Sequence, residues 1–279
     1  MKPLRYSLAL AAAFLAAWLA VGEEQAAKPV TGILGAMNYE VTALQGQMAD
    51  KQTQTILGIP FVTGELRGRR IVVARSGAGK VNAAMTATLL IDHFRPTEVV
   101  FTGIAGGINP DLKPGDLVIA KATAQHDMGD ITPAGFTPDA PRNPVDGARN
   151  PVSLPADPRL LALAQSVAER IALSAVKTSV GERPPRVTTG VVVTGDTFIA
   201  SSTKKAELRA QFEADAVEME GAAVAQVCYE QKVPCLVVRS LSDNADETAG
   251  VDLEQFYATA ADNAARFVSE LVARLGSEP

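Results

Sequence analysis

The chain has few of the residues from which disulfide scaffolds and metal centres are built. Its 279 residues include only two cysteines, Cys228 and Cys235, and two histidines, His93 and His126. Two cysteines cannot form a disulfide framework. We expect them to be free, buried thiols, and the sequence leaves a single bridge between them open. No Cys/His cluster has the spacing of metal ligands, so we expect no metal.

Basic charge and aromatic side chains are also scarce. The net charge is −5, and aromatic residues make up 5% of the chain. Because nucleic acids and anionic membranes attract basic surfaces, we expect neither as a partner. Hydrophobic residues, in contrast, make up 47% of the chain, which is enough for a full core in one large domain.

The first 22 residues have the three parts of a secretory signal. Lys2 and Arg5 precede an uncharged apolar run over Leu8–Val21, and small residues follow up to Gly22. This run is short for a transmembrane helix, which needs about 20 residues. We therefore predict a signal peptide over residues 1–22 and an exported, periplasmic protein, with residues 23–30 as a lead-in. An uncleaved membrane anchor is the alternative, and the sequence does not separate the periplasm from the medium.

Beyond residue 30, predicted strands alternate with predicted helices. A short apolar run such as Glu98–Ile104 has the composition of a buried strand, and Val81–Phe94 has the spacing of an amphipathic helix. This alternation predicts an α/β protein with one three-layer α/β/α domain over residues 31–279 and a central mixed sheet. We expect a single strand over Gln54–Glu65. Residues 127–157 are rich in Pro, Gly, Asp and Asn and are expected to form a long loop.

The strand predicted over Pro234–Leu241 ends in a cluster of polar residues. Arg239, Ser242 and Asp243 lie at its exit. Ligands of open α/β sheets bind at the carboxyl ends of strands, and an acid held there can stay protonated and act as a general acid. The same residues would suit a helix cap or a surface turn, since Ser and Asp favour both.

Two glycine-rich turns also follow predicted strands. Ser76–Lys80 looks like a phosphate loop, but Val81 stands where a magnesium-binding Ser or Thr is required. Tight packing is the simpler interpretation of this turn, and a role in lining a ligand site stays open because helix N-termini attract polar ligands. In the second turn, Gly103–Gly107, the glycines allow the backbone to approach a ligand closely.

Two further strand ends carry residues that suit a sugar and a flat ligand. Glu218 and Glu220 are two positions at the end of a predicted strand. We expect the carboxylate of one to face inward and that of the other to face outward. An inward carboxylate is costly unless it binds something, and it can accept hydrogen bonds from both hydroxyls of a ribose. The alternative is an acid placed at a helix N-terminus. Phe198, at another strand end, would stack on a flat ligand or fill the core.

Together these blocks resemble the nucleoside phosphorylase/nucleosidase superfamily, and within it the 5′-methylthioadenosine/S-adenosylhomocysteine nucleosidases. The resemblance covers nearly all of residues 31–275. The segments that carry it are Gly32–Met37 with Glu40-Val41, Ser76–Val81, Thr102–Gly107, Val193–Ile199, Val217–Glu220 and Val237–Asp246. It implies a nucleoside phosphorylase-like fold that hydrolyses the N-glycosidic bond of a purine nucleoside and releases adenine. It also implies no cofactor, and a homodimer that completes its 5′ pocket across the subunit interface.

The resemblance implies a role for each matching residue. Asp243, oriented by Ser242, would protonate or hydrogen-bond N7 of adenine so that the base can leave. Glu40, helped by Arg239, would act on the attacking water. Glu220 would bind the ribose hydroxyls. The other substrate-binding positions are Met219 against the sugar, Phe198 and the Ile199 backbone at adenine, Ala36 and Met37 on the sugar and 5′ side, and Ile104 and Gly106 in the glycine-rich turn.

The choice between water and phosphate as nucleophile rests on two positions. Phosphorylases of the superfamily carry phosphate-binding arginines where this chain has Phe101 and close to where it has Glu40. A phenyl ring cannot bind an oxyanion and a carboxylate repels one, so hydrolysis is favoured. The chain departs from the nucleosidase pattern at Ile104, where that pattern has serine, and at Asn38-Tyr39, which replaces an acidic pair. The alternatives are a phosphate-dependent purine nucleoside phosphorylase and a non-catalytic exported nucleoside-binding protein.

Overall fold

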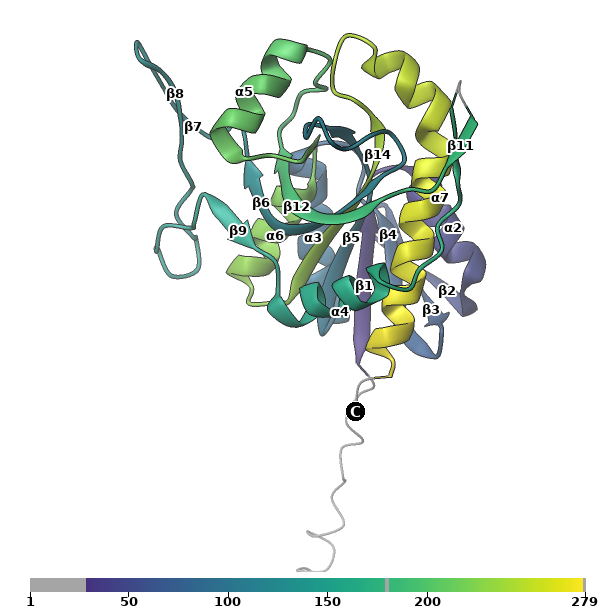
Figure 1. Cartoon of the computed structure of the whole chain (residues 1–279). Coiled ribbons are helices and arrows are strands. Elements are labelled where there is room, and N and C mark those ends of the chain that lie inside the picture. The colour runs from purple at the N-terminus through teal and green to yellow at the C-terminus, as the bar shows by residue number, and fades with distance from the viewer. Residues whose placement is uncertain (1–28, 179–180, 278–279) are drawn as a thin grey trace, which may run out of the picture.

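The computed structural model describes residues 29–178 and 181–277. The predicted signal peptide therefore lies outside the described residues. A ten-stranded mixed sheet runs through the molecule in the order β13-β12-β6-β14-β5-β1-β4-β3-β2, with β9 paired to β6 (Figure 1). Its strands are β1 (Val30–Gly35), β2 (Ala49–Ile56), β3 (Ile59–Leu66), β4 (Arg69–Arg75), β5 (Glu98–Gly107), β6 (Leu117–Gln125), β9 (Ser153–Pro155), β12 (Val187–Thr194), β13 (Ala216–Glu218) and β14 (Cys235–Asp243).

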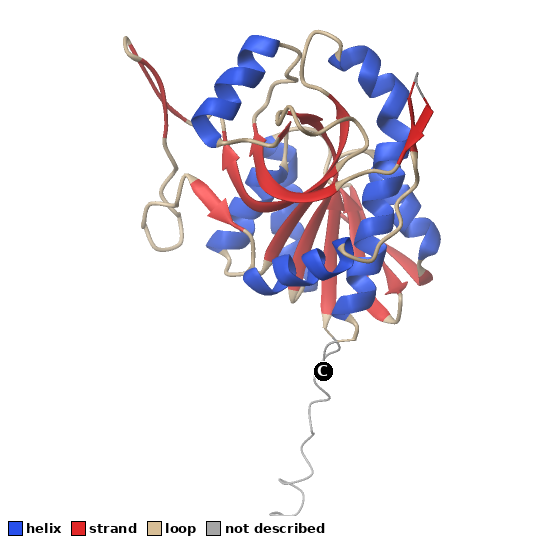
Figure 2. Ribbon diagram, in the orientation of Figure 1, coloured by secondary structure: helices blue, strands red, loops and turns tan. Residues whose placement is uncertain are grey.

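One half of the sheet curls until it closes on itself. Short strand β13 pairs with β12 on one side, and its residues Ala216 and Val217 pair with Gly107 and Gly106 of β5 on the other. Strands β5, β14, β6, β12 and β13 thus form a closed ring of paired strands, visible in Figure 2 as curved arrows. Closure brings the carboxyl ends of β5, β12, β13 and β14 together at one rim.

Helices cover both faces of the sheet and complete three layers (Figure 2). One apolar core packs α3 and α6 against one face, and a second packs α2, α4 and α7 against the other. The helices are α2 (Asn38–Gln47), α3 (Lys80–Phe94), α4 (Pro158–Ala168), α5 (Ser202–Phe212), α6 (Gly221–Glu230) and α7 (Ala249–Leu275). The predicted α/β/α architecture with a central mixed sheet is confirmed.

The prediction of a single strand over Gln54–Glu65 is wrong. The chain turns at Leu57-Gly58, where both residues have positive φ, and strands β2 and β3 pair as an antiparallel hairpin. A two-residue hairpin turn in which both residues have positive φ is of type I′, and Asn-Gly is its usual signature. Because leucine stands in the first position of this turn, the sequence does not carry the usual signature.

The prediction of a long loop over residues 127–157 is also wrong in part. Strands β7 (Gly129–Thr132) and β8 (Gly135–Pro138) form a hairpin that projects from the body (Figure 1). Gly129 and Gly135 adopt positive φ at this hairpin, which few other residues tolerate. A further hairpin, β10 (Val176–Thr178) with β11 (Gly181–Arg183), was not predicted at all.

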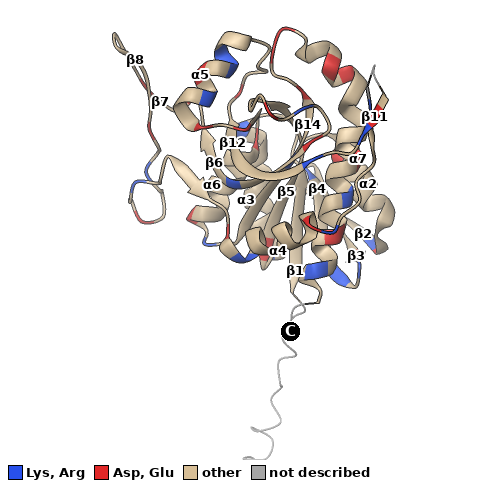
Figure 3. Cartoon of the chain, in the orientation of Figure 1, with Lys and Arg blue, Asp and Glu red and all other residues tan. Residues whose placement is uncertain are grey.

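Charged residues of both signs are interspersed along the helices and loops (Figure 3). Within residues 29–178 and 181–277, no helix is long and apolar enough to cross a membrane. The same residues contain no group of three His, Cys, Asp or Glu side chains placed to hold a metal ion.

Candidate active site

A cavity of about 260 Å³ opens at the rim where the strand ends meet. Every residue predicted for the site lines it, except Arg239. These lining residues are Ala36, Met37, Glu40, Ile104, Gly106, Phe198, Ile199, Met219, Glu220, Ser242 and Asp243. They come from segments up to about 200 positions apart in the chain, and the curled sheet brings them to one place.

Asp243 is the last residue of β14 and is almost fully buried. The hydroxyl of Ser242 lies 2.7 Å from Asp243 Oδ2, and the Ala245 amide donates to Oδ1 at 2.8 Å. These contacts fix the orientation of the carboxyl group. Burial raises the pKa of Asp243, against the opposing effect of the two hydrogen bonds. A carboxyl group in this setting holds its proton more tightly than one in water.

Glu220 caps the N-terminus of α6 and also faces the cavity. Its Oε1 accepts a hydrogen bond from the amide of Gly79 at 2.8 Å. Burial, together with the neighbouring charge of Glu218, raises the pKa of Glu220 to about 7. The prediction that only one of the two carboxylates faces inward is wrong, since both side chains are buried. The strand ends at Glu218, and the turn into α6 points Glu220 back into the protein.

Glu218, one of the two carboxylates at this strand end, has a role in the site that the sequence did not indicate. Its Oε2 accepts from Arg239 Nη2 at 2.7 Å, from the Gly221 amide at 2.7 Å and from the Glu220 amide at 3.0 Å. Its Oε1 accepts from the hydroxyl of Thr194. With both oxygens engaged inside the protein, Glu218 anchors its neighbours.

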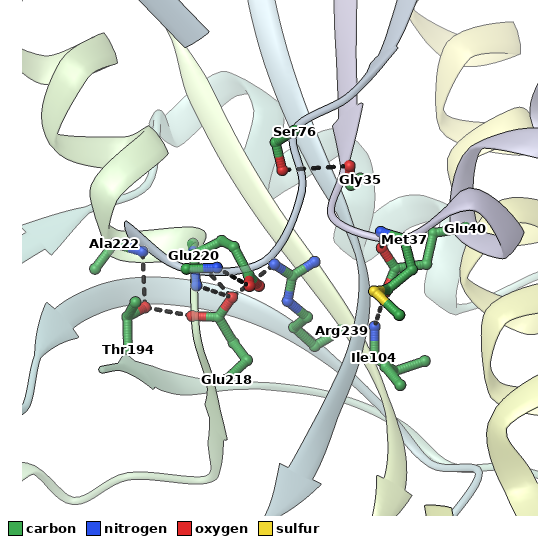
Figure 4. A network of polar contacts seen from close by, with 12 residues as sticks. Gly35, Met37, Glu40, Ser76, Ile104, Thr194, Glu218, Glu220, Ala222 and Arg239 are labelled. Atoms are coloured by element: carbon green, nitrogen blue, oxygen red, sulfur yellow. Dashed lines mark hydrogen bonds and ion pairs between the residues drawn. The ribbon is translucent and has the colours of Figure 1, made fainter. Parts of the chain in front are cut away.

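Arg239 lies behind the cavity wall, between Glu218 and Glu40 (Figure 4). Its guanidinium carbon is 4.1 Å from the centre of the Phe101 ring, a distance typical of a cation–π contact. The ring that replaces a phosphate-binding arginine of the phosphorylases therefore supports this arginine. Within the described part of the chain, Nε and Nη1 of Arg239 have no hydrogen-bond partner.

Glu40 lies in the first turn of α2, and two backbone amides hold its carboxyl group. The amide of Met37 donates to Oε2 at 2.8 Å, and the amide of Ile104 donates to Oε1 at 3.2 Å. Burial raises the pKa of Glu40, although the positive charge of Arg239 opposes the shift. Gly103, with φ of 155°, separates Glu40 from Arg239. A Cβ atom on Gly103 would lie 2.6 Å from Glu40 Oε1 and 2.8 Å from Arg239 Nη1, so both atoms border the same small space.

The turn Ser76–Lys80 resembles a phosphate loop only in sequence. At the start of α3, the amide of Gly79 donates to Glu220, and the amide of Lys80 donates to Asp196 Oδ1 at 2.8 Å. The protein's own carboxylates therefore occupy this helix N-terminus. The turn contributes to the site by holding Glu220.

Four cavity-lining residues besides Glu218 stand out among those that were not predicted. Thr197 directly precedes Phe198 after the end of β12, and Val217 lies on β13 two positions before Met219, so proximity in sequence could have indicated both. Leu253 and Tyr257 come from the first turns of α7, where no motif marks them. Only the packing of α7 over the end of β14 brings these two side chains to the site.

A larger cavity, of about 370 Å³, lies near the amino end of β14 and contains none of the predicted site residues. It is lined in part by Cys228, Cys235 and Tyr229. Both cysteines are free, as expected. Contact with the thiol of Cys235, together with burial, raises the pKa of Cys228. This cavity lacks the converging carboxyl groups of the first one.

Comparison with known proteins agrees with this geometry. A family model for the phosphorylase superfamily matches residues 30–273. The 5′-methylthioadenosine/S-adenosylhomocysteine nucleosidase from Neisseria meningitidis, in complex with methylthio-immucillin-A, is 35% identical, with a TM-score of 0.74 over 88% of this chain and 98% of that chain. The corresponding enzyme from Colwellia psychrerythraea, in complex with adenine, is 36% identical, with a TM-score of 0.76 over 89% and 96%.

A third similar structure is that of an enzyme with a different named activity. Futalosine hydrolase of Helicobacter pylori is 34% identical, with a TM-score of 0.73 over 88% of this chain and 97% of that chain. The resemblance detected in the sequence is thereby confirmed along most of the described residues. The chain belongs to the phosphorylase superfamily.

Proposed function

We propose that the protein is a nucleosidase that hydrolyses the N-glycosidic bond of a purine nucleoside and releases adenine. 5′-Methylthioadenosine and S-adenosylhomocysteine are the substrates we favour. The observation that carries this proposal is the convergence of three buried carboxyl groups, of Glu40, Glu220 and Asp243, on one cavity. Their separate settings suit three separate roles.

Asp243 acts as the general acid at the leaving base. Loss of a purine from ribose passes through an oxocarbenium-like transition state, in which negative charge develops on the base. An acid near N7 neutralises that charge, provided that it holds a proton near neutral pH. The raised pKa of Asp243 and the fixed position of its carboxyl group support this role.

Glu40 and Arg239 handle the attacking water. Glu40 Oε1 and the unpartnered Nη1 of Arg239 lie 2.6 and 2.8 Å from the same point beside Gly103, so the two atoms are close enough together for one water to bond to both. Phosphate is disfavoured there because the carboxylate of Glu218 already neutralises Arg239, and Glu40 adds a further acidic group beside it. This balance of charge supports hydrolysis over phosphorolysis.

The rest of the cavity binds the nucleoside itself. Glu220 accepts hydrogen bonds from the ribose hydroxyls and Met219 packs on the sugar. Phe198 stacks on adenine, and its side chain is 54% exposed. The backbone of Ile199 reads the edge of the base, and Gly106 lets the strand approach it.

Assembly and location form part of the same proposal. The protein acts as a homodimer, and the β7–β8 hairpin that projects from the body supports a role in contacts with a second copy (Figure 1). Ile131 on this hairpin is 87% exposed, so its apolar side chain is available for a contact with a second copy. The signal-like residues 1–22 support export to the periplasm.

Futalosine hydrolysis is the second candidate, favoured by the 34% identity to the Helicobacter pylori enzyme. In both candidate reactions water cleaves the N-glycosidic bond of a nucleoside, and the two differ in the nucleoside that is bound. The two candidates therefore share the roles given to Asp243, Glu220 and Glu40.

The test is a substrate panel with purified protein. Methylthioadenosine, adenosylhomocysteine, futalosine, adenosine and inosine are incubated with and without phosphate, and base release is measured. Base release at an unchanged rate without phosphate supports a nucleosidase. Strict dependence on phosphate would identify a phosphorylase, and tight binding without base release would identify a binding protein.

A further inference from the structure

The two cysteines of the chain meet between helix α6 and the start of strand β14. Cys228 lies in α6 and is completely buried, and Cys235 is the first residue of β14 and is partly exposed. Both side chains line the 370 Å³ cavity and pack in the same apolar core. Their thiols are in contact. The proposed nucleoside chemistry uses neither of them.

Hydrogen-bonded backbone fixes the position of both cysteines. Lys232, with a φ of 57°, lies in the turn that follows α6. The amide of Val233 then donates to the carbonyl oxygen of Cys228 at 2.8 Å. Two residues later, Cys235 enters the sheet in register with Val99 of β5. The two thiols therefore meet because a helix end and a strand start are held together, and no flexible loop has to close.

The side chain of Cys235 lies on the face of the sheet that α6 covers. Cys235 and Val237 are two positions apart on β14, so their side chains share one face. Val237 packs in the core with α3 and α6, whereas Leu236 and Val238 pack in the core on the other face. A bond between the sulfur atoms of Cys228 and Cys235 would therefore cross the interface between the helix and the sheet.

The cavity gives a small molecule access to one of the two thiols. Tyr229 is 46% exposed and Lys232 is also exposed, so the cavity that they line opens to the surface. Contact with the thiol of Cys235, together with burial, raises the pKa of Cys228, and little of this thiol is ionised at neutral pH. Cys235 is therefore the thiol that a reagent meets first, and Cys228 is placed to react second.

We propose that Cys228 and Cys235 form an intramolecular disulfide when the protein meets a disulfide oxidant such as oxidised glutathione. The thiolate of Cys235 attacks one sulfur of the oxidant, which gives a mixed disulfide and releases one reduced glutathione. The thiolate of Cys228 then attacks the Cys235 sulfur and releases the second reduced glutathione. The two cysteine thiols lose two protons and two electrons, and the two released glutathione molecules take them up. The proposed export would place the protein in an oxidising compartment, where disulfides persist.

The disulfide would join α6 and β14 at the ends that lie away from the candidate active site. At its other end α6 begins beside Glu220, and β14 ends at Asp243. Neither cysteine lines the cavity that contains these carboxyl groups. The bond therefore restrains the two elements that carry Glu220 and Asp243 without a contact to the substrate. Its formation does not depend on the proposed nucleosidase activity.

Mass spectrometry tests whether the bond forms. The reduced protein is incubated overnight with oxidised glutathione at pH 8, unfolded in urea and treated with iodoacetamide. We expect a protein that is lighter by two hydrogen atoms and carries no alkyl group, with one proteolytic product that links Cys228 to Cys235. Two alkylated cysteines, a lasting glutathione adduct on the wild type or a bond between two copies would overturn the proposal.

Two variants test the order of the two attacks. Cys228→Ala keeps the accessible thiol and removes its partner, so the reaction should stop at a glutathione adduct on Cys235. Cys235→Ser keeps only the buried thiol and should remain unmodified under the same conditions. An adduct that forms on Cys228 in Cys235→Ser but not on Cys235 in Cys228→Ala would overturn the assigned order.

Thermal unfolding tests whether the bond stabilises the fold. The chain between the two cysteines is short, so the gain from closing this loop is limited, and we expect the Tm of the oxidised wild type to exceed that of the reduced form by about 5 °C. Dithiothreitol should reverse the rise. Cys235→Ser is the matched control, because it cannot close the bond and should unfold at the same Tm before and after treatment with oxidant. An oxidised wild type with an unchanged or lower Tm would show that the bond does not stabilise the contact between α6 and β14.

Discussion

The carboxylate of Glu218 lies 2.7 Å from the guanidinium of Arg239, and both side chains are almost completely excluded from solvent. An isolated charge in such a place would be very costly, so each of the two groups depends on the other. The pair also fixes the orientation of the guanidinium group. Glu218 engages Nη2, the Phe101 ring lies against the guanidinium, and Nη1 is left near Glu40. The position of the proposed water therefore depends on a glutamate outside the reaction itself.

Glu218→Gln should destabilise the protein strongly. The substitution keeps the shape of the side chain but leaves the buried charge of Arg239 unpaired. Removing one partner of a buried ion pair lowers the free energy of unfolding by about 3–5 kcal/mol. Urea unfolding, followed by circular dichroism at pH 7, measures the change.

An exposed ion pair supplies the matched control for this variant. Arg67 and Glu270 approach to 3.0 Å, but their side chains are about half exposed. Glu270→Gln should therefore change the free energy of unfolding by less than about 1 kcal/mol. Similar losses in Glu218→Gln and Glu270→Gln would show that burial does not control the strength of the Glu218–Arg239 pair.

Asp243→Asn should nearly abolish adenine release and leave the protein folded. Asparagine keeps the size of the side chain and can still accept from the Ala245 amide, but it carries no proton for N7. General acid catalysis contributes about 10²–10⁴-fold, so we expect a loss in kcat within that range. The fold is checked by circular dichroism and by retained binding of adenine. Unchanged turnover would remove Asp243 from the mechanism.

The sequence predicted the site better than it predicted the hairpins. Asp243, Glu220 and Phe198 were candidates because each stands at the end of a predicted strand, where ligands bind in an α/β fold, and the family resemblance implied the role of each. The turn at Leu57-Gly58 was not predicted, because leucine rarely adopts the positive φ that Leu57 has there. The closed ring of strands was also invisible, because it depends on pairing between β13 and β5, which are far apart in the chain.

The roles of Glu218 and Tyr257 could not be read from the sequence for a different reason. A carboxylate two positions before Glu220 gives no sign of whether it binds a ligand or an arginine. Tyr257 lies inside a long amphipathic helix, where an aromatic residue is ordinarily part of the core. The partner of Glu218 depends on how the chain turns from β13 into α6. The placement of Tyr257 depends on how α7 packs over the end of β14.

Gly103→Ala should lower kcat by a larger factor than it lowers the equilibrium constant for folding. A methyl group there would lie within 3 Å of both Glu40 Oε1 and Arg239 Nη1, and these atoms border the space proposed for the water. The residue also has a φ of 155°, which L side chains rarely adopt. We expect a loss of about 100-fold or more in kcat, because small displacements of catalytic groups have effects of that size.

Gly46→Ala is the control for this substitution. Gly46 lies in α2, the same helix as Glu40, and an added Cβ meets nothing within 4 Å. Alanine should stabilise the helix by about 0.5–1 kcal/mol and leave kcat unchanged. If Gly103→Ala keeps wild-type turnover, the space beside Gly103 has no role in the reaction.

Glu220 makes the stability of the free protein depend on pH in a direction opposite to that of most carboxylates. Its pKa is about 7 in the folded protein, above the ordinary value of 4.5. The folded state therefore holds a proton at Glu220 that the unfolded state releases between these two values. The resulting stability is complete below pH 4.5 and is lost as pH rises through about 7, a change of up to about 3 kcal/mol.

Glu220→Gln should remove this dependence, because glutamine is neutral at every pH and its carbonyl can still accept from the Gly79 amide. The variant and the wild type should differ little at pH 5, and the variant should be more stable at pH 8. Urea unfolding at both pH values gives the difference between the two proteins, in which the other buried carboxyl groups cancel. Parallel pH profiles would contradict the raised pKa and place an ionised Glu220 in the free protein at neutral pH. A variant that gains stability at pH 8 but no longer binds nucleosides would show that the buried charge is kept for the ribose.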